Sequence, residues 1–339
     1  MVRAWLGSGR SVRSAWRPGA LTRWLGGLAL LGLLLGPQGS ALAQAGKAIS
    51  VAYMPIANCL QFFVALDKGF FTEQGVEAKR KVLAGGAVIA PALEAGDVQV
   101  GYSNSISIIA AHDRGFDFQI ITPAPLHEAP KHVFNGLLAG ANTSITTLKD
   151  LEGKRVAINT LGNINDLNMK MIAAKYGIDL AKVKLLEVDF PKMEPALRNN
   201  QIDAAILTEP FYTVVAKNKV GRPVLADTFS AIAPRFLVAV WFAKKAWMEQ
   251  NAELAGKFST AMNRATDYIN GHMGEMPELI SRYTKLTAAL AKEIGWAGFS
   301  TSIKKSDLQV LIDSSQKYGF IKKTFNAGDI VSKFVPVTE

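Results

Sequence analysis

Small polar side chains stand at two junctions between an expected strand and an expected helix. One junction follows a strand expected at residues 98–102, and the other precedes a helix expected at residues 166–176. Such side chains accept hydrogen bonds from the free N–H groups of a helix N-terminus, which is also a place to hold an anion. Ligand contact and helix capping alone both remain open for these residues. They are Ser103, Asn104, Ser105, Thr160, Gly162 and Asn163.

Further candidates for ligand binding lie in three other loops at expected strand ends. Tyr53 could stack on a ligand, and Asn58 could donate a hydrogen bond to it from the side-chain amide. Gln61 ends the same loop. Glu209 could bind a ligand amine, or accept hydrogen bonds from donors of the first lobe when the lobes close. The alternative for each is a turn role without ligand contact. The remaining candidates in these loops are Gly85 and Gly86, which permit close backbone approach, and Phe211.

The sequence offers no catalytic or metal-binding constellation, and we predict no cofactor. Cys59 is the one cysteine, so an internal disulfide is impossible, and beside Leu60 it is typical of a small buried residue. The four histidines lack the spacing of a metal site, and no Ser/His/Asp arrangement stands out. Four positive groups could face an anionic ligand, and the favoured alternative for each of them singly is a surface position: His127, Lys131, His132 and Arg235.

The charge of the chain does not indicate a nucleic-acid partner. The formal net charge is +10, but residues 1–43 contain five arginines and no acidic residue. The remainder has 33 basic and 28 acidic residues, a mild and scattered excess.

The N-terminus is typical of an export signal. An arginine-bearing segment precedes an apolar run at residues 25–35, which is too short for a permanent membrane helix of about 20 residues. Gly36-Pro37 then breaks the helix, and Ala41-Leu42-Ala43 fits signal-peptidase cleavage after Ala43. We therefore expect a soluble, monomeric protein in the periplasm.

Alternating strand and helix patterns fill the rest of the chain, which predicts an α/β protein. A helix–turn–Asp–strand unit at residues 91–105 recurs at 194–210, which indicates two similar lobes, each a mostly parallel sheet flanked by helices. Asn200 takes the turn position that Gly96 has in the first copy, because Asn tolerates the left-handed conformation. The expected organisation is a first lobe at 44–138, a second at 139–235, and completion of the first at 236–339 by C-terminal helices, one of them at 287–295. The first crossing is expected at 138–144.

Several motifs are similar to those of periplasmic solute-binding proteins of the NMT1/THI5-like superfamily, the nitrate-, taurine- and alkanesulfonate-binding group. The resemblance covers roughly residues 46–260. The motifs, in order, are residues 66–76 (LDKGFFTEQGV), Gly85-Gly86, residues 93–98 (LEAGDV), residues 148–156 (LKDLEGKRV), and residues 201–204 (QIDA) with Glu209-Pro210.

The resemblance implies a two-lobed clamp of the type II periplasmic binding-protein kind, with a ligand cleft between the lobes. It implies that the protein captures a small organic solute, expected to be a sulfonate, carboxylate or aromatic acid. The implied partners are an ABC permease with its ATPase. Two alternatives remain: an enzyme of the same fold acting on a pyrimidine or chorismate-type precursor, and a sensory ligand-binding protein.

Overall fold

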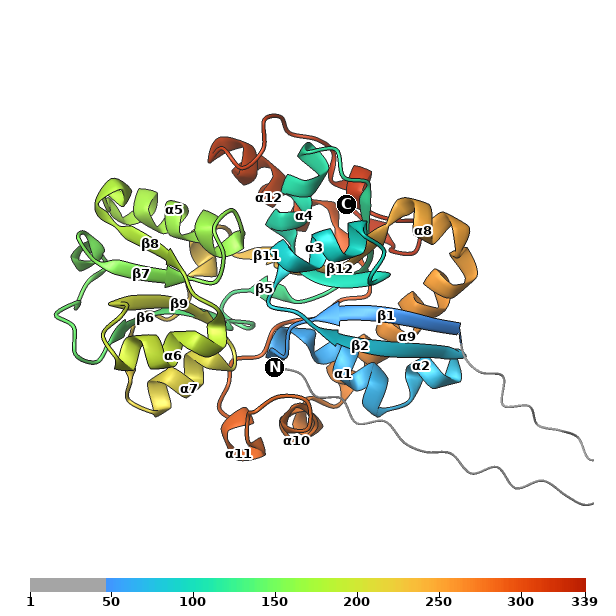
Figure 1. The fold of residues 1–339 in the computed structure, drawn as a ribbon, viewed down its shortest axis with the longest axis horizontal. Coiled ribbons are helices and arrows are strands. Elements are labelled where there is room, and N and C mark those ends of the chain that lie inside the picture. Colours follow the sequence, from blue (N-terminus) through green and yellow to red (C-terminus); the bar gives the residue numbers. More distant parts are fainter. Residues whose placement is uncertain (1–46) are drawn as a thin grey trace, which may run out of the picture. The chain divides into compact units, whose positions relative to one another are not determined.

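The computed structural model describes residues 47–339. The predicted signal peptide and its cleavage site lie outside these residues. Two five-stranded sheets organise the described chain, with strand orders β2-β1-β3-β12-β4 and β8-β7-β9-β6-β10. We call the first sheet with its helices the first lobe, and the second sheet with its helices the second lobe (Figure 1).

The first lobe is built from crossover units and one returning strand. Its strands are β1 (Lys47–Tyr53), β2 (Val76–Val82), β3 (Val100–Asn104), β4 (Phe118–Pro123) and β12 (Ala239–Lys244). β1 pairs in parallel with β2 and β3, whereas β12 is antiparallel to both β3 and β4. The helices that precede β12 in the chain are α1 (Leu60–Asp67), α2 (Phe70–Glu73), α3 (Gly86–Glu94) and α4 (Ser105–Asp113).

The second lobe repeats this topology. Its strands are β6 (Asn135–Gly140), β7 (Arg155–Ile158), β8 (Lys184–Glu187), β9 (Ala204–Thr208) and β10 (Gly221–Leu225). β7 is parallel to β8 and β9, and β6 is the reversed strand, antiparallel to β9 and β10. In both lobes, the reversed strand is the one that follows a crossing from the other lobe. The predicted pair of similar, mostly parallel lobes is confirmed.

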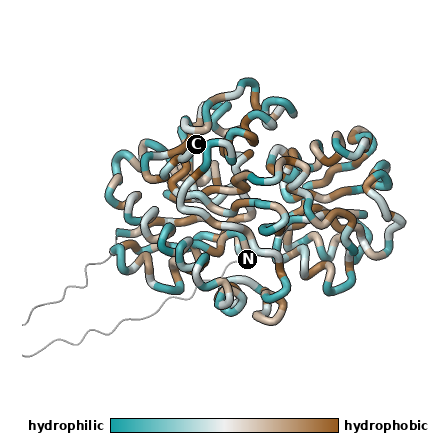
Figure 2. Tube along the Cα trace, turned by 180° about the vertical axis from the view of Figure 1, so that it is seen from behind, coloured by the Kyte–Doolittle hydropathy of each residue, from teal (hydrophilic) through white to brown (hydrophobic). Residues whose placement is uncertain are grey.

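The core of the second lobe follows from the two-residue period of its strands. Leu137, Val156 and Ile206 pack under α5 (Ile164–Tyr176), while their neighbours in the chain pack on the opposite face. That opposite face is covered by α6 (Phe190–Arg198) and α7 (Phe211–Lys217) (Figure 1). Because both faces are covered, the strands read as continuous apolar runs. Figure 2 shows hydrophobic residues along the strands and hydrophilic residues on the outer helices.

The two crossings form a small sheet of their own. β5 (Leu126–Glu128) pairs antiparallel with β11 (Arg235–Leu237). Along the chain, each of the two strands stands between the last strand of one lobe and the next strand of the other. The first crossing therefore lies before β6 and not at residues 138–144, where the sequence predicted it. The apolar run at 133–139 gave no sign that it belonged to the second sheet, because both sheets have equally apolar strands. The second crossing coincides with the expected boundary at 235/236.

The C-terminal part is helical, as expected, and much of it packs on the first lobe. It comprises α8 (Lys245–Gln250), α9 (Ala252–Gly271), α10 (Met276–Ser281), α11 (Ala288–Ala291) and α12 (Lys305–Lys317), with a short β13–β14 pair (Ile303–Lys304, Val337–Thr338). The helix expected at 287–295 is only the one-turn α11. No helix among the described residues has the length and apolar character needed to cross a membrane.

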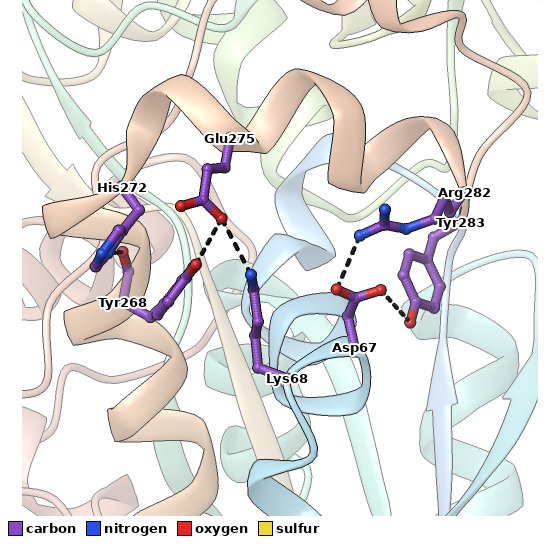
Figure 3. A network of polar contacts seen from close by, with 7 residues as sticks. All are labelled: Asp67, Lys68, Tyr268, His272, Glu275, Arg282 and Tyr283. Atoms are coloured by element: carbon purple, nitrogen blue, oxygen red, sulfur yellow. Dashed lines mark hydrogen bonds and ion pairs between the residues drawn. The ribbon is translucent and has the colours of Figure 1, made fainter.

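A network of polar contacts fixes this helical part to the start of the first lobe (Figure 3). Lys68 Nζ lies 3.0 Å from Glu275 Oε2, which also accepts a hydrogen bond from the Tyr268 hydroxyl. Arg282 Nη2 donates to Asp67 Oδ2 over 2.8 Å. The pairs are largely exposed, so their role is to orient α9 and α10 more than to stabilise the fold.

Residues after α11 remain packed on the first lobe and also touch the second. The Gly295 N–H donates to Glu209 Oε1 over 3.2 Å, and Glu293 forms an ion pair with Lys217 at the end of α7. Gly298 exchanges two backbone hydrogen bonds with Leu126 of β5. We call residues 293–298 the strap. The expectation that this region serves only to complete the first lobe was therefore too simple.

Candidate functional site

One cavity is lined by residues of both lobes. The first lobe contributes Asn58, Tyr102 and Asn104, while the second contributes Asn159 and Asn163, among others. Its volume is about 40 Å³, which is room for a few water molecules. A solute larger than that needs the lobes to separate before it can enter. The cavity lies at the strand ends where open α/β sheets usually bind ligands.

Amide side chains dominate the polar lining of this cavity. Six asparagines contribute to it: Asn58, Asn104, Asn135, Asn159, Asn163 and Asn165. Three aromatic residues, Tyr102, Phe190 and Phe229, line it as well. Each amide offers both donors and an acceptor, so the cavity can hydrogen-bond a polar group without contributing a formal charge.

The amides are held in place by one another. Asn159 Oδ1 accepts from the Nδ2 atoms of Asn163 and Asn165, each over 2.8 Å. Asn165 Oδ1 in turn accepts from Asn135 Nδ2 over 3.4 Å. Because these side chains are oriented by their own contacts, little ordering is left for a ligand to impose.

Two hydrogen bonds across the cavity join the lobes directly. Asn104 Oδ1 accepts from the Ile164 N–H over 3.3 Å. Asn58 Nδ2 donates to Thr208 Oγ1, at the end of β9, over 3.4 Å. Both bonds are long, so separation of the lobes sacrifices little hydrogen-bond energy at this point.

Three helices begin at the cavity wall: α3, α4 and α5. The N-cap of α4 is Asn104, whose Oδ1 accepts from Ser107 N over 3.0 Å. The N-cap of α5 is Asn163, whose Oδ1 accepts from Asn165 N and Asp166 N. The first residue of α3, Gly86, also lines the cavity. Each N-terminus carries about half a positive charge from its helix dipole, which favours a negative group.

No charged side chain lines the cavity within residues 47–339. Arg235 instead pairs with Glu128 over 2.8 Å and Asp307 over 3.0 Å. His127 is fully buried beside β11 and Phe229, and burial lowers its pKa; burial also lowers the pKa of His132. Neither these three residues nor Lys131 line the cavity. The positive charge next to the cavity therefore comes from helix N-termini and not from these four side chains.

The structure brings five of the candidate residues to this cavity. They are Asn58, Gly86, Asn104, Thr160 and Asn163. The Thr160 hydroxyl is engaged with its neighbour, since it donates to the Asn159 carbonyl over 2.7 Å. A Cβ at Gly86 would collide with Ser103 Oγ, so close approach of α3 to β3 explains the glycine.

Tyr53 and Gln61 lie in the core of the first lobe and not at the cavity. The Tyr53 ring packs between Phe62 and Phe63, with centroids 5.2 and 5.6 Å away. Gln61 is fully buried and bonds to the Pro123 carbonyl and the Thr266 hydroxyl, and it accepts from Trp241 Nε1. Tyr53 therefore packs β1 against α1, and Gln61 links α1 with β12 and α9.

Ser103 and Ser105 also point away from the cavity. β3 extends two residues beyond the expected strand end, so Tyr102 and Asn104 face the cavity while Ser103 faces α3. Ser105 Oγ donates to the Leu237 carbonyl in β11 over 2.7 Å, which ties α4 to the crossing. Gly85 is the N-cap of α3, and Gly162 takes a left-handed turn with φ of 72° at the edge of a neighbouring groove.

Glu209 and Phe211 lie at the lobe boundary beside the cavity. Glu209 is buried and accepts from Thr213 N and Oγ1 as well as from Gly295 N of the strap. Thr213 belongs to the same lobe as Glu209, and only Gly295 belongs to the segment expected to complete the first lobe. Desolvation raises the carboxyl pKa of Glu209. Phe211 stacks on Phe190 with centroids 5.8 Å apart.

Several residues that line the cavity were not predicted. Asn159 follows β7 and Thr208 ends β9. In the first lobe, small polar residues at a strand end were taken as candidates, and the same criterion applied here would have identified these two. Asn135 begins β6, whose lobe was misassigned. Phe190 and Phe229 carry no sequence signal that separates them from core aromatics.

Cys59 is a core residue. It is fully buried and has no disulfide partner, and burial raises the pKa of its thiol. A thiolate nucleophile is therefore disfavoured at this position. Within residues 47–339, no group of three or more His, Cys, Asp or Glu side chains is placed to hold a metal ion.

Comparisons with known proteins place the chain in one family. The family model described as NMT1/THI5 like matches residues 56–275. The taurine-binding periplasmic protein of Escherichia coli is 27% identical over 247 residues, covering 70% of this chain and 72% of that protein. A 4-amino-5-hydroxymethyl-2-methylpyrimidine phosphate synthase of Saccharomyces cerevisiae is 23% identical, covering 64% of this chain and 65% of the enzyme.

Solved structures show the same fold. The periplasmic nitrate-binding protein of Synechocystis superposes with a TM-score of 0.70 at 14% identity, covering 85% of this chain and 86% of that one. The periplasmic aliphatic sulphonate binding protein of Escherichia coli gives a TM-score of 0.66 at 14% identity, covering 86% and 94%. The fold is therefore that of the periplasmic binding proteins, and the chain belongs to the NMT1/THI5-like family.

Proposed function

We propose that this protein is the periplasmic solute-binding component of an ABC importer. It captures a small organic solute with an oxyanion head, such as a sulfonate, a carboxylate or an aromatic acid, and delivers it to a permease with its ATPase. One observation carries the proposal: three helix N-termini and six asparagines meet at one cavity between two lobes.

The choice of an anion follows from the chemistry of the lining. A cationic solute would need a carboxylate to balance its charge, and none lines the cavity among the described residues. An oxyanion suits N–H and amide donors, because a charged acceptor strengthens each hydrogen bond. Taurine, nitrate and sulphonates, named for three of the similar proteins, all present oxyanions.

Lobe closure gives the binding step. The cavity of about 40 Å³ is too small for an organic solute, and the lobes are joined by two crossings paired as β5 and β11. Two short crossing segments suit a hinge, which lets the cleft open and close around a ligand.

An enzymatic role like that of the yeast relative receives less support from the site. The cavity lining within the described residues has no carboxylate, imidazole, thiol or amine to transfer a proton. Tyr102 is the one titratable group there, and burial raises its pKa well above the ordinary value. Such a phenol is a poor base at neutral pH.

A thermal-shift screen of the mature protein tests the proposal. The panel contains short sulfonates, carboxylates, aromatic acids and nitrate, together with matched amines and a free pyrimidine. We expect at least one oxyanion to raise the melting temperature, because a ligand that binds only the folded state stabilises it. Stabilisation by amines alone would refute the anion assignment, and stabilisation by the pyrimidine alone would favour the enzymatic alternative.

A further inference from the structure

The orientation of the asparagine amides decides which hydrogen-bonding groups the cavity offers to a ligand. An asparagine side chain has a carbonyl oxygen with two lone pairs at one end and an NH₂ group with two hydrogens at the other. If the oxygens faced the ligand, the cavity would offer acceptors, and if the NH₂ groups faced it, the cavity would offer donors. Hydrogen bonds within the protein settle this choice for most of the asparagines that line the cavity.

The orientation of Asn163 follows from the backbone. Its side-chain Oδ1 accepts from the N–H groups of Asn165 and Asp166 over 2.8 and 3.2 Å. A backbone N–H group can only donate, so the end of the Asn163 amide that faces these groups is the oxygen. The Nδ2 end of Asn163 therefore faces the opposite way, where it donates to Asn159 Oδ1 over 2.8 Å.

The orientation of Asn163 determines that of the amides beyond it. Because Asn163 Nδ2 is a donor, the Asn159 atom that it meets is the oxygen, and Asn165 meets the same oxygen with its own Nδ2, over 2.8 Å. The Oδ1 of Asn165 then lies on the other side, where it accepts from Asn135 Nδ2 over 3.4 Å. Asn135 Oδ1 accepts in turn from the buried Thr228 hydroxyl. The series of amides therefore has a single direction.

Asn159 is left with both of its N–H groups. It is half-buried and lines the cavity, and its oxygen already accepts from two amides. Its Nδ2 donates to no protein group within residues 47–339. Asn159 therefore offers a ligand two donors and no free lone pair of its side-chain oxygen.

Asn104, on the opposite lobe, has the same polarity. Its Oδ1 accepts from the N–H groups of Ser107 and Ile164, while Nδ2 uses one of its two hydrogens on Ser107 Oγ. Of the six asparagines in the lining, only Asn58 has an oxygen that accepts no hydrogen bond from the described part of the chain. Donors are therefore in excess at the cavity.

We propose that Asn159 is a specificity-determining residue that selects the head group of the solute by its hydrogen-bonding pattern. Asn163 and Asn165 are positioning residues, because they hold the oxygen of Asn159 and leave its NH₂ group for the ligand. The selected head group carries acceptors only. A head group of the same shape with N–H or O–H groups is rejected, since a donor placed against a donor leaves both without a partner. This inference rests on the proposed function and adds a criterion that holds for neutral head groups as well as charged ones.

Three head groups of similar shape separate the hydrogen-bonding pattern from the charge. Benzoate is charged and carries acceptors only, nitrobenzene is neutral and carries acceptors only, and benzamide is neutral and carries two N–H donors. Acetate, nitromethane and acetamide repeat the comparison on a smaller skeleton. Each probe competes, in calorimetry on the purified protein, with an oxyanion found in the thermal-shift screen. We expect each nitro compound to bind at least about tenfold more tightly than the matching carboxamide, because unpaired donors weaken binding.

The outcomes for the inference and for the proposed function are distinct. Equal affinity for the nitro compounds and the carboxamides, tighter binding of the carboxamides, or no competition by either would overturn the inference and leave the proposed function intact. If no oxyanion binds at all, the proposed function and the inference fail together.

Asn159→Asp reverses the hydrogen-bonding pattern at one position. One carboxylate oxygen keeps the bonds from Asn163 and Asn165, while the other puts an acceptor where the two N–H groups were. The ratio of nitro to carboxamide affinity should fall at least about a hundredfold, so that the carboxamide becomes the better ligand. Asn142→Asp adds the same charge at an exposed position outside the lining and should keep the wild-type ratio. The wild-type ratio in Asn159→Asp would overturn the proposal.

Asn165→Ala tests the positioning role. The variant removes one of the two donors to Asn159 Oδ1, so the Asn159 amide can turn its oxygen toward a ligand. The ratio of nitro to carboxamide affinity should therefore fall severalfold. A residue with a structural role alone would lower the melting temperature and weaken both neutral ligands equally. An unchanged ratio in Asn165→Ala would contradict the positioning of Asn159 by its neighbours.

Discussion

At the scale of single residues, the cavity is polar without being charged, and four of its asparagines, Asn135, Asn159, Asn163 and Asn165, are hydrogen-bonded to one another. Gln61 shows that a buried amide can be held entirely by protein groups and not by a ligand. It was a ligand-binding candidate on position alone, yet its amide is fully consumed by the Thr266 hydroxyl, the Pro123 carbonyl and the Trp241 indole N–H.

Replacing Gln61 with Leu should destabilise the protein without changing ligand affinity. The substitution removes one hydrogen-bond partner from each of three buried polar groups, of which the Thr266 hydroxyl keeps its bond to the Met262 carbonyl, and each group left unsatisfied costs about 1–3 kcal/mol. Chemical denaturation and calorimetry separate the two effects. Gln250→Leu, at an exposed position of α8, is the control. Unchanged stability with lost binding would return Gln61 to the site.

Glu209 should make stability depend on pH in the direction opposite to most carboxylates. Desolvation raises its folded-state pKa above the ordinary value of 4.5, so the folded state retains a proton that the unfolded chain loses. Its contribution to stability is therefore complete below pH 4.5 and is lost as pH rises through the folded pKa. In Glu209→Gln, the free energy of unfolding should no longer fall over that pH range. An identical pH profile for both proteins would contradict the raised pKa.

At the scale of secondary-structure elements, the site depends on where helices begin and which way strand residues point. The periodic patterns were enough to predict two mostly parallel sheets, the repeated unit and the left-handed turn at Asn200, whose φ is 54°. The same patterns placed the end of β3 at residue 102, two residues before its end at Asn104 in the structure. That shift sends Ser103 to α3 and Asn104 to the cavity, because successive strand residues face opposite sides.

The rest of the site escaped the sequence for related physical reasons. Lobe membership of β6 depends on long-range pairing with β9, which an apolar run does not reveal. Phe190 and Phe229 reach the cavity only through the packing of separate segments. The helix caps, in contrast, were predictable, since Asn104 and Asn163 both satisfy free N–H groups next to them.

Replacing Asn104 with Ala should weaken α4 and the contact between lobes together. The variant loses the bond to Ser107 N, worth about 0.5–2 kcal/mol at an N-cap, and the bond to Ile164 N. Asn104→Ser keeps a capping oxygen but is too short to bridge the lobes. The melting temperature should fall in Asn104→Ala and should largely recover in Asn104→Ser. Equal losses in both variants would contradict the capping role.

At the scale of the whole described chain, the lobes are linked by the β5–β11 pair and also by the strap. The strap is anchored in the first-lobe core by Ile294 and Ala297 and reaches the second lobe through Glu293 and Gly295. It therefore adds contacts that exist only when the lobes are together.

Reversing the charge of Glu293 should weaken ligand binding without altering the cavity. Glu293→Lys opposes Lys217, and an exposed ion pair contributes about 0.2–1 kcal/mol, so affinity should fall by up to about fivefold. The double variant Lys217→Glu/Glu293→Lys should recover it. Glu278→Lys, an exposed control on α10, should bind normally. Failure of the double variant to recover affinity would separate the strap from closure.

The central claim is that a small oxyanion binds where three helix N-termini and six asparagines meet. Isothermal titration of an oxyanion found in the thermal-shift screen, into wild type and Asn163→Asp, tests it most directly. Aspartate keeps a capping carboxylate for α5 but puts negative charge into the cavity wall. We predict one site per chain in wild type and at least a tenfold loss in the variant, titrated well below the melting temperature of the variant, which loses the bond from Asn163 Nδ2 to Asn159 Oδ1. Undiminished binding by Asn163→Asp would contradict the account.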